Sequence, residues 1–468
     1  MDLPKNIFIN PDNSAKTAMK LIDTNGWGVV FVVDKKMILR GVVTPGDIRR
    51  AIDVGYDISN TVESLMNEKP LIISEGINPK AATAIIFENL KEKESEVKEE
   101  INHIKIPVIN QKKQVIDIAT FNQTETSLSL AFGLQASINN QGIGKVLIVG
   151  GAGYLGSVLS RLLLSKGYRV RVLDSLLFGE EPIKELATNS YFELIKGDVR
   201  NIQTLHKSLY GVDAVIHLAA IVGDPASQKF PQDTIGVNYL ASMTLALACK
   251  YYQINKFIFA STCSVYGVGA NKLDEQSPLN PVSLYARTKI ESEKGILSLA
   301  DDNFRPVIMR MSTLYGPSPR MRFDLVVNTF AKMAATEGRI VIFGGNQWRP
   351  LLHVSDAAQA YLQALENPLP HLGNLVFNVG TDEQNFTIAE IGQLVKTVLP
   401  ETKVITKKQD KNTNIDKRTY QVSFKKIEKE LSFKANNTVS EALLAIYDSI
   451  ITGKIKDPTN DNYYNVVQ

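Results

Sequence analysis

Tyr285 and Lys289 are the residues of this sequence whose types and spacing most directly indicate chemistry. They stand four positions apart in SLYARTKIESEKG, and on a helix that spacing puts both side chains on one face. A lysine beside a phenol favours the phenolate and lowers a pKa that is ordinarily about 10. Thr262, in KFIFASTCSVYG, adds a hydroxyl just beyond a predicted strand. Together the three residues predict proton transfer at a substrate hydroxyl whose carbon gives hydride to a nicotinamide.

A glycine-rich turn predicts where that nicotinamide cofactor binds. Gly150, Gly153 and Gly156 follow the apolar strand KVLIV and open an apolar-periodic helix. Glycine there permits a tight turn and close approach of the backbone to a pyrophosphate, which the helix N-terminus stabilises. A second strand, RVRVLD, ends in Asp174, whose carboxylate can accept hydrogen bonds from ribose hydroxyls and repels a 2′-phosphate. The pattern therefore favours NAD over NADP.

The elements around these residues predict the fold that positions them. Apolar strands alternate with helical segments from residue 145 onward: KVLIVG, RVRVLD, YFELIKGD, AVIHLAA, KFIFAS and PVIMRMS. Such alternation predicts an α/β fold with a Rossmann-type, doubly wound parallel sheet. The strand ends at Gly197-Asp198-Val199 and at Leu218-Ala219-Ala220 should reach the same crevice as the glycine turn.

The segments GGAGYLGS, GDVR, HLAA, ASTCSVYG and YARTK, with Asp174 between the first two, resemble the extended short-chain dehydrogenase/reductase family, especially its nucleotide-sugar epimerase and dehydratase branch. The likeness covers about Lys145 to Ile455 and implies a small C-terminal substrate-binding subdomain. It implies that Thr262, Tyr285 and Lys289 form the catalytic set. The cofactor contacts that it implies are Gly150, Gly153, Tyr154, Leu155, Gly156, Asp174, Asp198, Val199, Leu218, Ala219, Ala220, Asn238, Ser261, Tyr285 and Lys289.

The same resemblance implies a nucleotide-diphosphate sugar as substrate. Arg349, just ahead of a His-Val-x-Asp stretch, is the candidate for the diphosphate, because a guanidinium matches phosphate oxygens. The other implied substrate contacts are Ser264, Thr313 and Arg418. Dehydratases of the family carry a carboxylate after the catalytic threonine, whereas this chain has Cys263 and Ser264 there. Epimerisation by retained NAD is therefore favoured over elimination of water.

Two other functions stay open at this point. A ketoreductase or dehydrogenase acting on the same substrate class would consume free NAD(P)H in step with product. A nucleotide or redox sensor would keep the dinucleotide fold without chemistry, although intact Thr262, Tyr285 and Lys289 argue against it.

The N-terminal region predicts a separate α/β domain. PKNIFINPDNSAKTAMKLI is echoed about sixty-five residues later by EKPLIISEGINPKAATAII. Gly41, Thr44 and Asp47 in LRGVVTPGDIRRAIDVG resemble the signature of a CBS-domain pair, in which the threonine and aspartate bind adenine or another nucleotide. We expect a CBS pair over 1–121, regulatory or dimerising, a linker over 122–144 and the enzyme domain over 145–468.

Bulk composition excludes several other classes. Lysine and arginine total 52 against 49 acidic residues, a net charge of +3, so we expect no nucleic-acid partner. Nowhere do eighteen apolar residues follow one another, and MDLPKNIFIN has no leader pattern, so we expect a cytoplasmic protein that does not bind a membrane. Cys249 and Cys263 have no metal-ligand spacing, so no metal is expected. CBS pairs and family helices both self-associate, which predicts a homo-oligomer, a dimer or a tetramer.

Overall fold

A computed structural model describes residues 5–25, 27–74, 103–122, 127–130, 144–301, 304–367, 375–407 and 418–465. The chain divides into two compact units, Met1–Gly144 with Asp301–Phe304, and Lys145–Ala300 with Arg305–Gln468. Most of the predicted linker and of the second copy of the N-terminal repeat lies outside the described residues. The predicted domain boundaries stay predictions.

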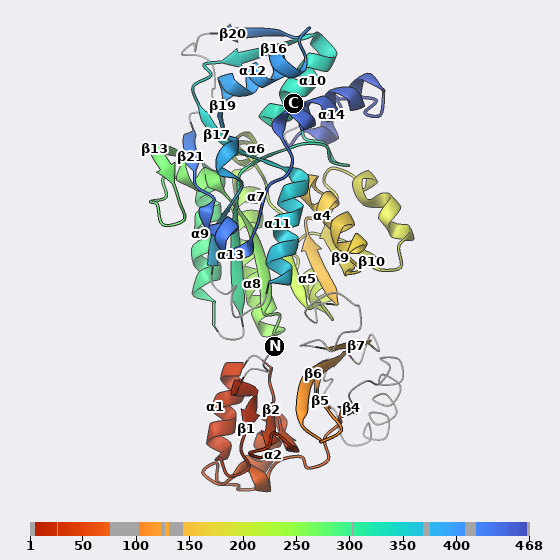
Figure 1. Ribbon diagram of the computed structural model, residues 1–468, viewed down its shortest axis with the longest axis vertical. Coiled ribbons are helices and arrows are strands. Elements are labelled where there is room, and N and C mark those ends of the chain that lie inside the picture. The colour runs from red at the N-terminus through yellow and green to blue at the C-terminus, as the bar shows by residue number, and fades with distance from the viewer. Residues whose placement is uncertain are drawn as a thin grey trace. The chain divides into compact units, whose positions relative to one another are not determined.

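The first unit contains two small sheets with the same pairing pattern (Figure 1). In the first sheet β1 (Phe8–Ile9) lies parallel to β2 (Val30–Val33), which pairs antiparallel with β3 (Leu39–Val43). In the second sheet β4 (Ile73–Ser74) lies parallel to β5 (His103–Ile109), which pairs antiparallel with β6 (Val115–Asn122). β7 (Ser127–Leu130) extends the second sheet. Helices α1 (Ala15–Asn25) and α2 (Pro45–Asp53) accompany the first sheet.

The hairpin turns of the two sheets are built alike. The carboxylate of Asp34 accepts hydrogen bonds from the second and fourth following N–H groups, and the amide oxygen of Asn110 does the same in its own turn. Met37 and Lys113 each lie three residues further on with φ near +60°. Leu39 N donates to Lys113 O at 3.0 Å, and Val115 N donates to Met37 O at 3.3 Å. Each turn thus accepts a backbone hydrogen bond from the strand that follows the other turn, a pattern with local two-fold symmetry.

The second unit is built on a seven-stranded parallel sheet in the order β10-β9-β8-β11-β12-β14-β18 (Figure 1). Its inner strands β8, β11, β12 and β14 are almost fully buried, as a sheet covered on both faces requires, whereas the edge strand β10 is partly exposed. Helices α4 (Tyr154–Ser165) and α11 (Val354–Glu366) pack together, while α5 (Ile202–Leu209), α8 (Ala241–Tyr251) and α9 (Leu284–Ser298) form another layer. The strands are β8 (Lys145–Val149), β9 (Arg169–Asp174), β10 (Phe192–Lys196), β11 (Ala214–His217), β12 (Lys256–Thr262), β14 (Arg305–Met311) and β18 (Leu375–Val379).

The strand order places the ligand crevice. From β8 the chain moves outward to β9 and β10, and then returns to the other side of β8 at β11. Ligands of doubly wound sheets bind at such a switch point, outside the carboxyl ends of the strands. The loops after β8, β9, β11 and β12 therefore surround the expected site, and the fold class predicted from the sequence is confirmed.

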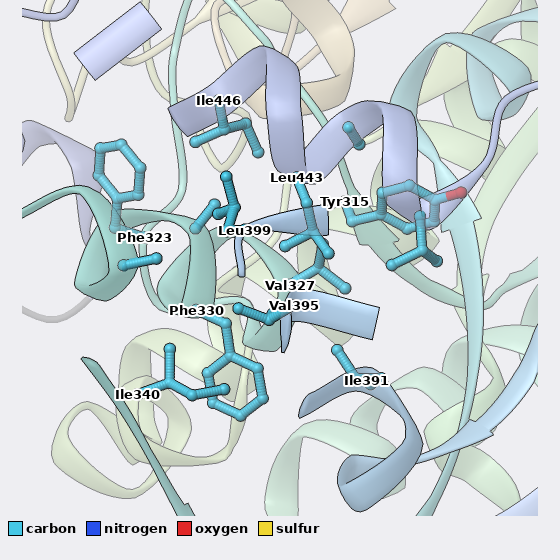
Figure 2. Packing of buried hydrophobic residues seen from close by; sticks show 14 of the residues in the cluster. Tyr315, Phe323, Val327, Phe330, Ile340, Ile391, Val395, Leu399, Leu443 and Ile446 are labelled. Atoms are coloured by element: carbon cyan, nitrogen blue, oxygen red, sulfur yellow. The ribbon is translucent and has the colours of Figure 1, made fainter. Parts of the chain in front are cut away.

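A smaller subdomain has its own apolar core, drawn in Figure 2. Val327 and Phe330 of α10 (Val326–Glu337), Ile391 of α12 (Ile388–Val398) and Leu443 of α14 (Val439–Ile451) meet there. The same part holds the pair β16 (Arg339–Phe343) and β20 (Lys403–Lys407).

Short elements complete the second unit. Two small sheets, β15-β17-β19 and β13-β21, lie beside the main sheet. The elements are α6 (Asp224–Lys229), α7 (Pro231–Ile235), β13 (Val268–Leu273), β15 (Thr313–Tyr315), β17 (Trp348–His353), β19 (Asn385–Thr387), β21 (Thr419–Val422) and α13 (Lys425–Leu431). No helix among the described residues is long and apolar enough to cross a membrane.

Candidate active site

The turn between β8 and α4 is closed by two glycines. Gly150 has φ of +90°, and a Cβ there would lie 2.6 Å from the nitrogen of Ala219. A Cβ at Gly156 would lie 2.2 Å from the oxygen of Gly150, closer than any side chain permits. Gly153 differs, because its φ is −75° and a Cβ would come only to 3.4 Å of the same oxygen. Among the described residues only that oxygen comes within 4 Å of such a Cβ, so the start of α4 is open at Gly153, where a helix N-terminus can accept an anion.

Tyr154 and Leu155, the first two residues of α4, are buried below the glycine-rich turn between β8 and α4. The Tyr154 hydroxyl donates to Gly316 O at 2.6 Å and accepts from Asn328 Nδ2 at 3.1 Å. Leu155 is buried. Tyr154 therefore joins the start of α4 to the loop that follows β15.

Asp174 ends β9 beside the glycine turn, as predicted. Its two carboxylate oxygens accept from Ala152 N at 2.9 Å and Leu176 N at 2.8 Å. Burial raises the pKa of Asp174, against these backbone hydrogen bonds. Each oxygen keeps a lone pair for a ribose hydroxyl, so the carboxylate fits the adenosine side of a dinucleotide.

The predicted contacts after β10 and β11 line the same end of the sheet. Asp198 forms an ion pair with Arg200 at 2.7 Å. Val199 is buried. The N–H groups of Leu218 and Ala219 both donate, at 2.8 Å, to the carbonyl of the last residue of β8. These bonds fold the end of β11 against β8 and leave three residues half-buried, Leu218, Ala219 and Ala220.

Thr262, Tyr285 and Lys289 come together at the carboxyl end of β12. Thr262 is the last residue of β12, and Tyr285 lies in the first turn of α9, which Ser283 caps. The side chain of Thr262 lies close enough to the phenol of Tyr285 to lower its pKa. Lys289, one turn further along α9, donates from Nζ to Ala260 O at 2.7 Å. Tyr285 and Lys289 therefore lie four residues apart on one helix, as their spacing predicted, and their catalytic roles stay predictions.

The expected depression of the tyrosine pKa is wrong. Burial raises the pKa of Tyr285 to about 12, although Arg322, Thr262 and Arg418 oppose it. Burial also lowers the pKa of Lys289 to about 7, opposed by Glu293. Desolvation disfavours the charged form of both groups and is the largest influence on each pKa.

Asn238 and Ser261 support the centre from neighbouring elements. Asn238 lies in a π-helical turn, Gly236–Leu240, and its side-chain amide accepts from Ile221 N at 2.7 Å and donates to Ile221 O at 3.0 Å. Ser261 donates to the carboxylate of Glu293, which is buried in an ion pair with Arg310 at 2.7 Å. In the described contacts, Asn238 thus fixes the loop after β11 and Ser261 binds a buried carboxylate.

Ser264 and Arg418, two of the residues predicted to bind substrate, contact each other near Tyr285. Arg418 Nη1 donates to Ser264 Oγ at 2.9 Å, and the hydroxyls of Ser264 and Tyr420 are 3.4 Å apart. Arg349 is buried and donates to the carbonyl of Arg418. Thr313 opens β15, which pairs with the strand that carries Arg349.

Sequence reasoning missed a carboxylate in this group. Asp224, at the start of α6, pairs with Arg418 at 3.5 Å and raises the pKa of Tyr285. Tyr420, whose hydroxyl lies beside that of Ser264, was also missed as a neighbour of the centre. Asp224 directly follows Gly223 after the HLAA strand end, and only that position in the sequence could have indicated it.

In the first unit, Thr44 and Asp47 are held against each other. Thr44 caps α2 and accepts from Asp47 N at 3.3 Å, while Asp47 accepts from Thr44 N at 2.8 Å. Arg50 pairs with Asp47 at 2.6 Å. Thr44 and Asp47, the two residues predicted to bind a nucleotide, therefore also form a capping box that stabilises α2.

The glycine turn at the switch point, the acid that ends β9 and the Tyr-Lys pair beside β12 define the class as an NAD-binding enzyme of the short-chain dehydrogenase type. More particularly, the chain belongs to the NAD dependent epimerase/dehydratase family, whose model matches residues 146–380. A CBS domain model matches residues 2–54, the first of the two predicted modules.

Relatives and solved structures agree with this assignment. The chain is 34% identical to an uncharacterized UDP-glucose epimerase, YtcB, of Bacillus subtilis over 51% of this chain and 78% of that protein. It is 30% identical to the UDP-glucose 4-epimerase of Lactobacillus helveticus over 51% of this chain and 76% of the relative. The structure of UDP-glucuronic acid 4-epimerase from Bacillus cereus with UDP-glucuronic acid and NAD aligns with a TM-score of 0.59 at 28% identity, covering 66% of this chain and 99% of that one. The predicted epimerase class and its cofactor, NAD, are confirmed.

Proposed function

We propose that this protein interconverts UDP-sugars that differ in configuration at C4, with NAD retained between turnovers. The observation that carries the proposal is the placement of Thr262 beside Tyr285 at the carboxyl end of β12, with Lys289 one turn further along α9 and bonded to Ala260 O. The neighbours named as UDP-glucose and UDP-glucuronate 4-epimerases support the substrate class.

Tyr285 would remove the proton of the sugar hydroxyl, with Thr262 holding the same oxygen. Bound NAD would supply the hydride acceptor for the sugar carbon and the hydride donor for re-reduction from the opposite face. Tyr285 then gives the proton back, so the sugar leaves with inverted configuration and no net redox change. The cations Arg322 and Arg418 lower the pKa of Tyr285 against its burial and so assist the ionised state.

The cofactor would be held by the residues around the glycine turn. The open first turn of α4 at Gly153 would accept the pyrophosphate, and Asp174 the adenosine ribose. Asp198, Val199, Leu218, Ala219 and Ala220 would border it from the neighbouring loops. Lys289 and Asn238 would fix the nicotinamide end, with Asn238 acting through the loop that it binds at Ile221.

The UDP-sugar would lie on the side of Tyr285 that carries the arginines. Arg349 and Arg418 would hold the diphosphate, since guanidinium groups form paired hydrogen bonds with phosphate oxygens. Ser264 and Thr313 would contact the sugar. Asp224 pairs with Arg418 at 3.5 Å, so substrate would have to displace or share that ion pair.

The deciding experiment is to incubate protein as isolated, with no added cofactor, with UDP-glucose, UDP-glucuronic acid or UDP-N-acetylglucosamine, and to identify the products by NMR. Formation of the C4 stereoisomer without added cofactor supports the proposal. If product forms only when NAD(P)H is supplied and consumed in step, the protein is a reductase and the proposal is wrong.

The first unit would bind an adenine or other nucleotide at Thr44 and Asp47, and would help to form a homo-oligomer. Support comes from the CBS match over residues 2–54 and from the position of both side chains at the N-terminus of α2. Titration of Thr44→Val with ATP tests the site, since the valine removes the hydroxyl but keeps the size. Unchanged affinity relative to the unmodified protein would leave Thr44 as a helix cap alone, and light scattering gives the oligomeric state.

A further inference from the structure

The segment Asn460–Asn465, which follows α14, packs on the catalytic unit at three separate points. Tyr463 O accepts from Phe323 N at 3.0 Å, and the two rings meet edge to face with centroids 5.7 Å apart. Lys332 donates to the Tyr464 hydroxyl at 2.8 Å. Both tyrosines pack against the apolar core whose buried residues Figure 2 draws. The segment is thus bound along its length.

One anchor of this segment is a buried arginine beside the adenosine side of the cofactor crevice. Arg320 donates from Nε to Asn462 O at 3.1 Å, and its guanidinium stacks 3.8 Å over the ring of Phe178, in the loop that follows Asp174. Arg320 also acts electrostatically on Asp174. A Cβ at Gly179, in the same loop, would lie 3.8 Å from the Asn462 amide nitrogen. This end of the segment therefore lies at the loop after β9.

The loop that carries Arg320 rests on the glycine turn itself. Ser318 Oγ donates to the carbonyl of Tyr154, the first residue of α4, at 2.7 Å. Ser318 Oγ is also 3.3 Å from Ser157 Oγ in the same helix. The helix N-terminus assigned to the pyrophosphate and the anchor of the 460–465 segment are therefore parts of one packed arrangement.

The other end of the segment reaches the loop after β11. Asn465 donates from Nδ2 to Val222 O at 3.3 Å, next to Ile221, which Asn238 holds from the opposite side. The Oδ1 of Asn465 is inaccessible to solvent, and no residue that the structure describes donates to it. A buried acceptor of this kind is normally paired, so a donor from a bound ligand is expected there.

The contacts at Gly179 and Val222 belong to the loops after β9 and β11, which flank β8 in the sheet. A dinucleotide bound at the β8 turn extends across those two loops. We propose that the 460–465 segment, anchored by Arg320 and Asn465, is a part of the cofactor site that holds NAD in place and slows its release. The inference rests on the proposed function, because retention of NAD matters to an enzyme that reuses the same NAD in every cycle.

The test measures the rate at which bound NAD leaves the full-length holoenzyme, using labelled NAD chased by excess unlabelled NAD. Asn465→Ala removes the tie to Val222, and a chain ending at Lys456 removes the whole segment. Asn436→Ala is the matched control, because that asparagine is exposed on the same unit. We expect release about fivefold faster for Asn465→Ala, which corresponds to about 1 kcal/mol, and more than tenfold faster for the shortened chain. The control should release NAD at the unmodified rate.

Unchanged NAD release in Asn465→Ala and in the shortened chain overturns the inference. If the shortened chain does not fold, the point variant decides alone. Amide hydrogen exchange of residues 460–465, with and without NAD, gives a readout independent of turnover, and protection by NAD is the expected result. Stereoisomer formation by the unmodified protein is assayed separately, so failure of the epimerase proposal and failure of this inference are distinguishable.

Discussion

The side chain of Thr262, the last residue of β12, lies close enough to the phenol of Tyr285, in the first turn of α9, to lower its pKa. The two groups meet where the central strands of the sheet end. The effect of Thr262 partly offsets the burial that raises the pKa of Tyr285. Thr262 therefore favours the ionised state of the group proposed to move the proton.

Tyr285→Phe should reduce turnover by about a hundredfold or more, because a positioned acid-base group contributes about 10²–10⁴ to the rate. NAD content should stay at the unmodified level, since the phenylalanine keeps the ring and loses only the hydroxyl. The measurement is stereoisomer formation by NMR alongside NAD content by absorbance. Tyr191→Phe, an exposed tyrosine on the same unit, is the control. Near-normal turnover in Tyr285→Phe would exclude Tyr285 as the acid-base residue.

Gly153→Ala and Gly156→Ala should separate cofactor binding from folding. At Gly153 the new methyl meets only an ordinary contact at 3.4 Å, so the variant should fold and bind NAD at least tenfold more weakly. At Gly156 it would lie 2.2 Å from the Gly150 carbonyl, so the turn itself must move. We expect a loss of several kcal/mol there. Urea unfolding and NAD titration of both variants check this, and equal stability losses would contradict the distinction.

The buried Lys289 should make stability rise with pH. Its pKa is about 7 in the folded protein and about 10.4 when unfolded, so the unfolded chain binds more protons across that interval. The stability contribution of Lys289 is therefore least favourable below pH 7 and improves as the pH rises toward 10. In cofactor-free protein, Lys289→Met should lose this pH dependence, and urea unfolding at several pH values measures it.

The control for that measurement is Lys294→Met, because Lys294 is exposed on the same helix and pairs at the surface with Glu291. It should retain the pH slope of the unmodified protein. A slope in Lys289→Met equal to that of the control would show that Lys289 is not desolvated.

Of the ion pairs on α9, the buried Glu293–Arg310 pair should contribute most to the free energy of unfolding. Both side chains are almost fully buried, and Glu293 accepts from the guanidinium at 2.7 to 3.2 Å and from Ser261. Glu293→Gln leaves a buried arginine without its counter-charge, which costs about 3–5 kcal/mol. Glu291→Gln, which breaks an exposed pair on the same helix, should cost less than about 1 kcal/mol. Urea unfolding of the two variants compares them directly.

Much of the fold and part of the site were predictable because they depend on local pattern. Strand and helix periods gave the doubly wound sheet, and the glycine turn with Asp174 indicated NAD. The four-residue spacing of Tyr285 and Lys289 correctly placed both on one face of α9. The roles of the individual residues and the domain boundaries stay predictions.

The sequence alone determined the elements, the cofactor class and the position of Tyr285 and Lys289 one turn apart on one helix. These follow from spacing within one helix or one strand-turn-helix unit. Only the tertiary structure decided which distant groups meet. Asp224 contacts Arg418 from 194 positions earlier in the chain, and Asn465 reaches Val222 across 243 positions. It also decided the sign of the Tyr285 pKa shift, because desolvation depends on all the elements that cover a side chain, and no sequence spacing encodes that burial.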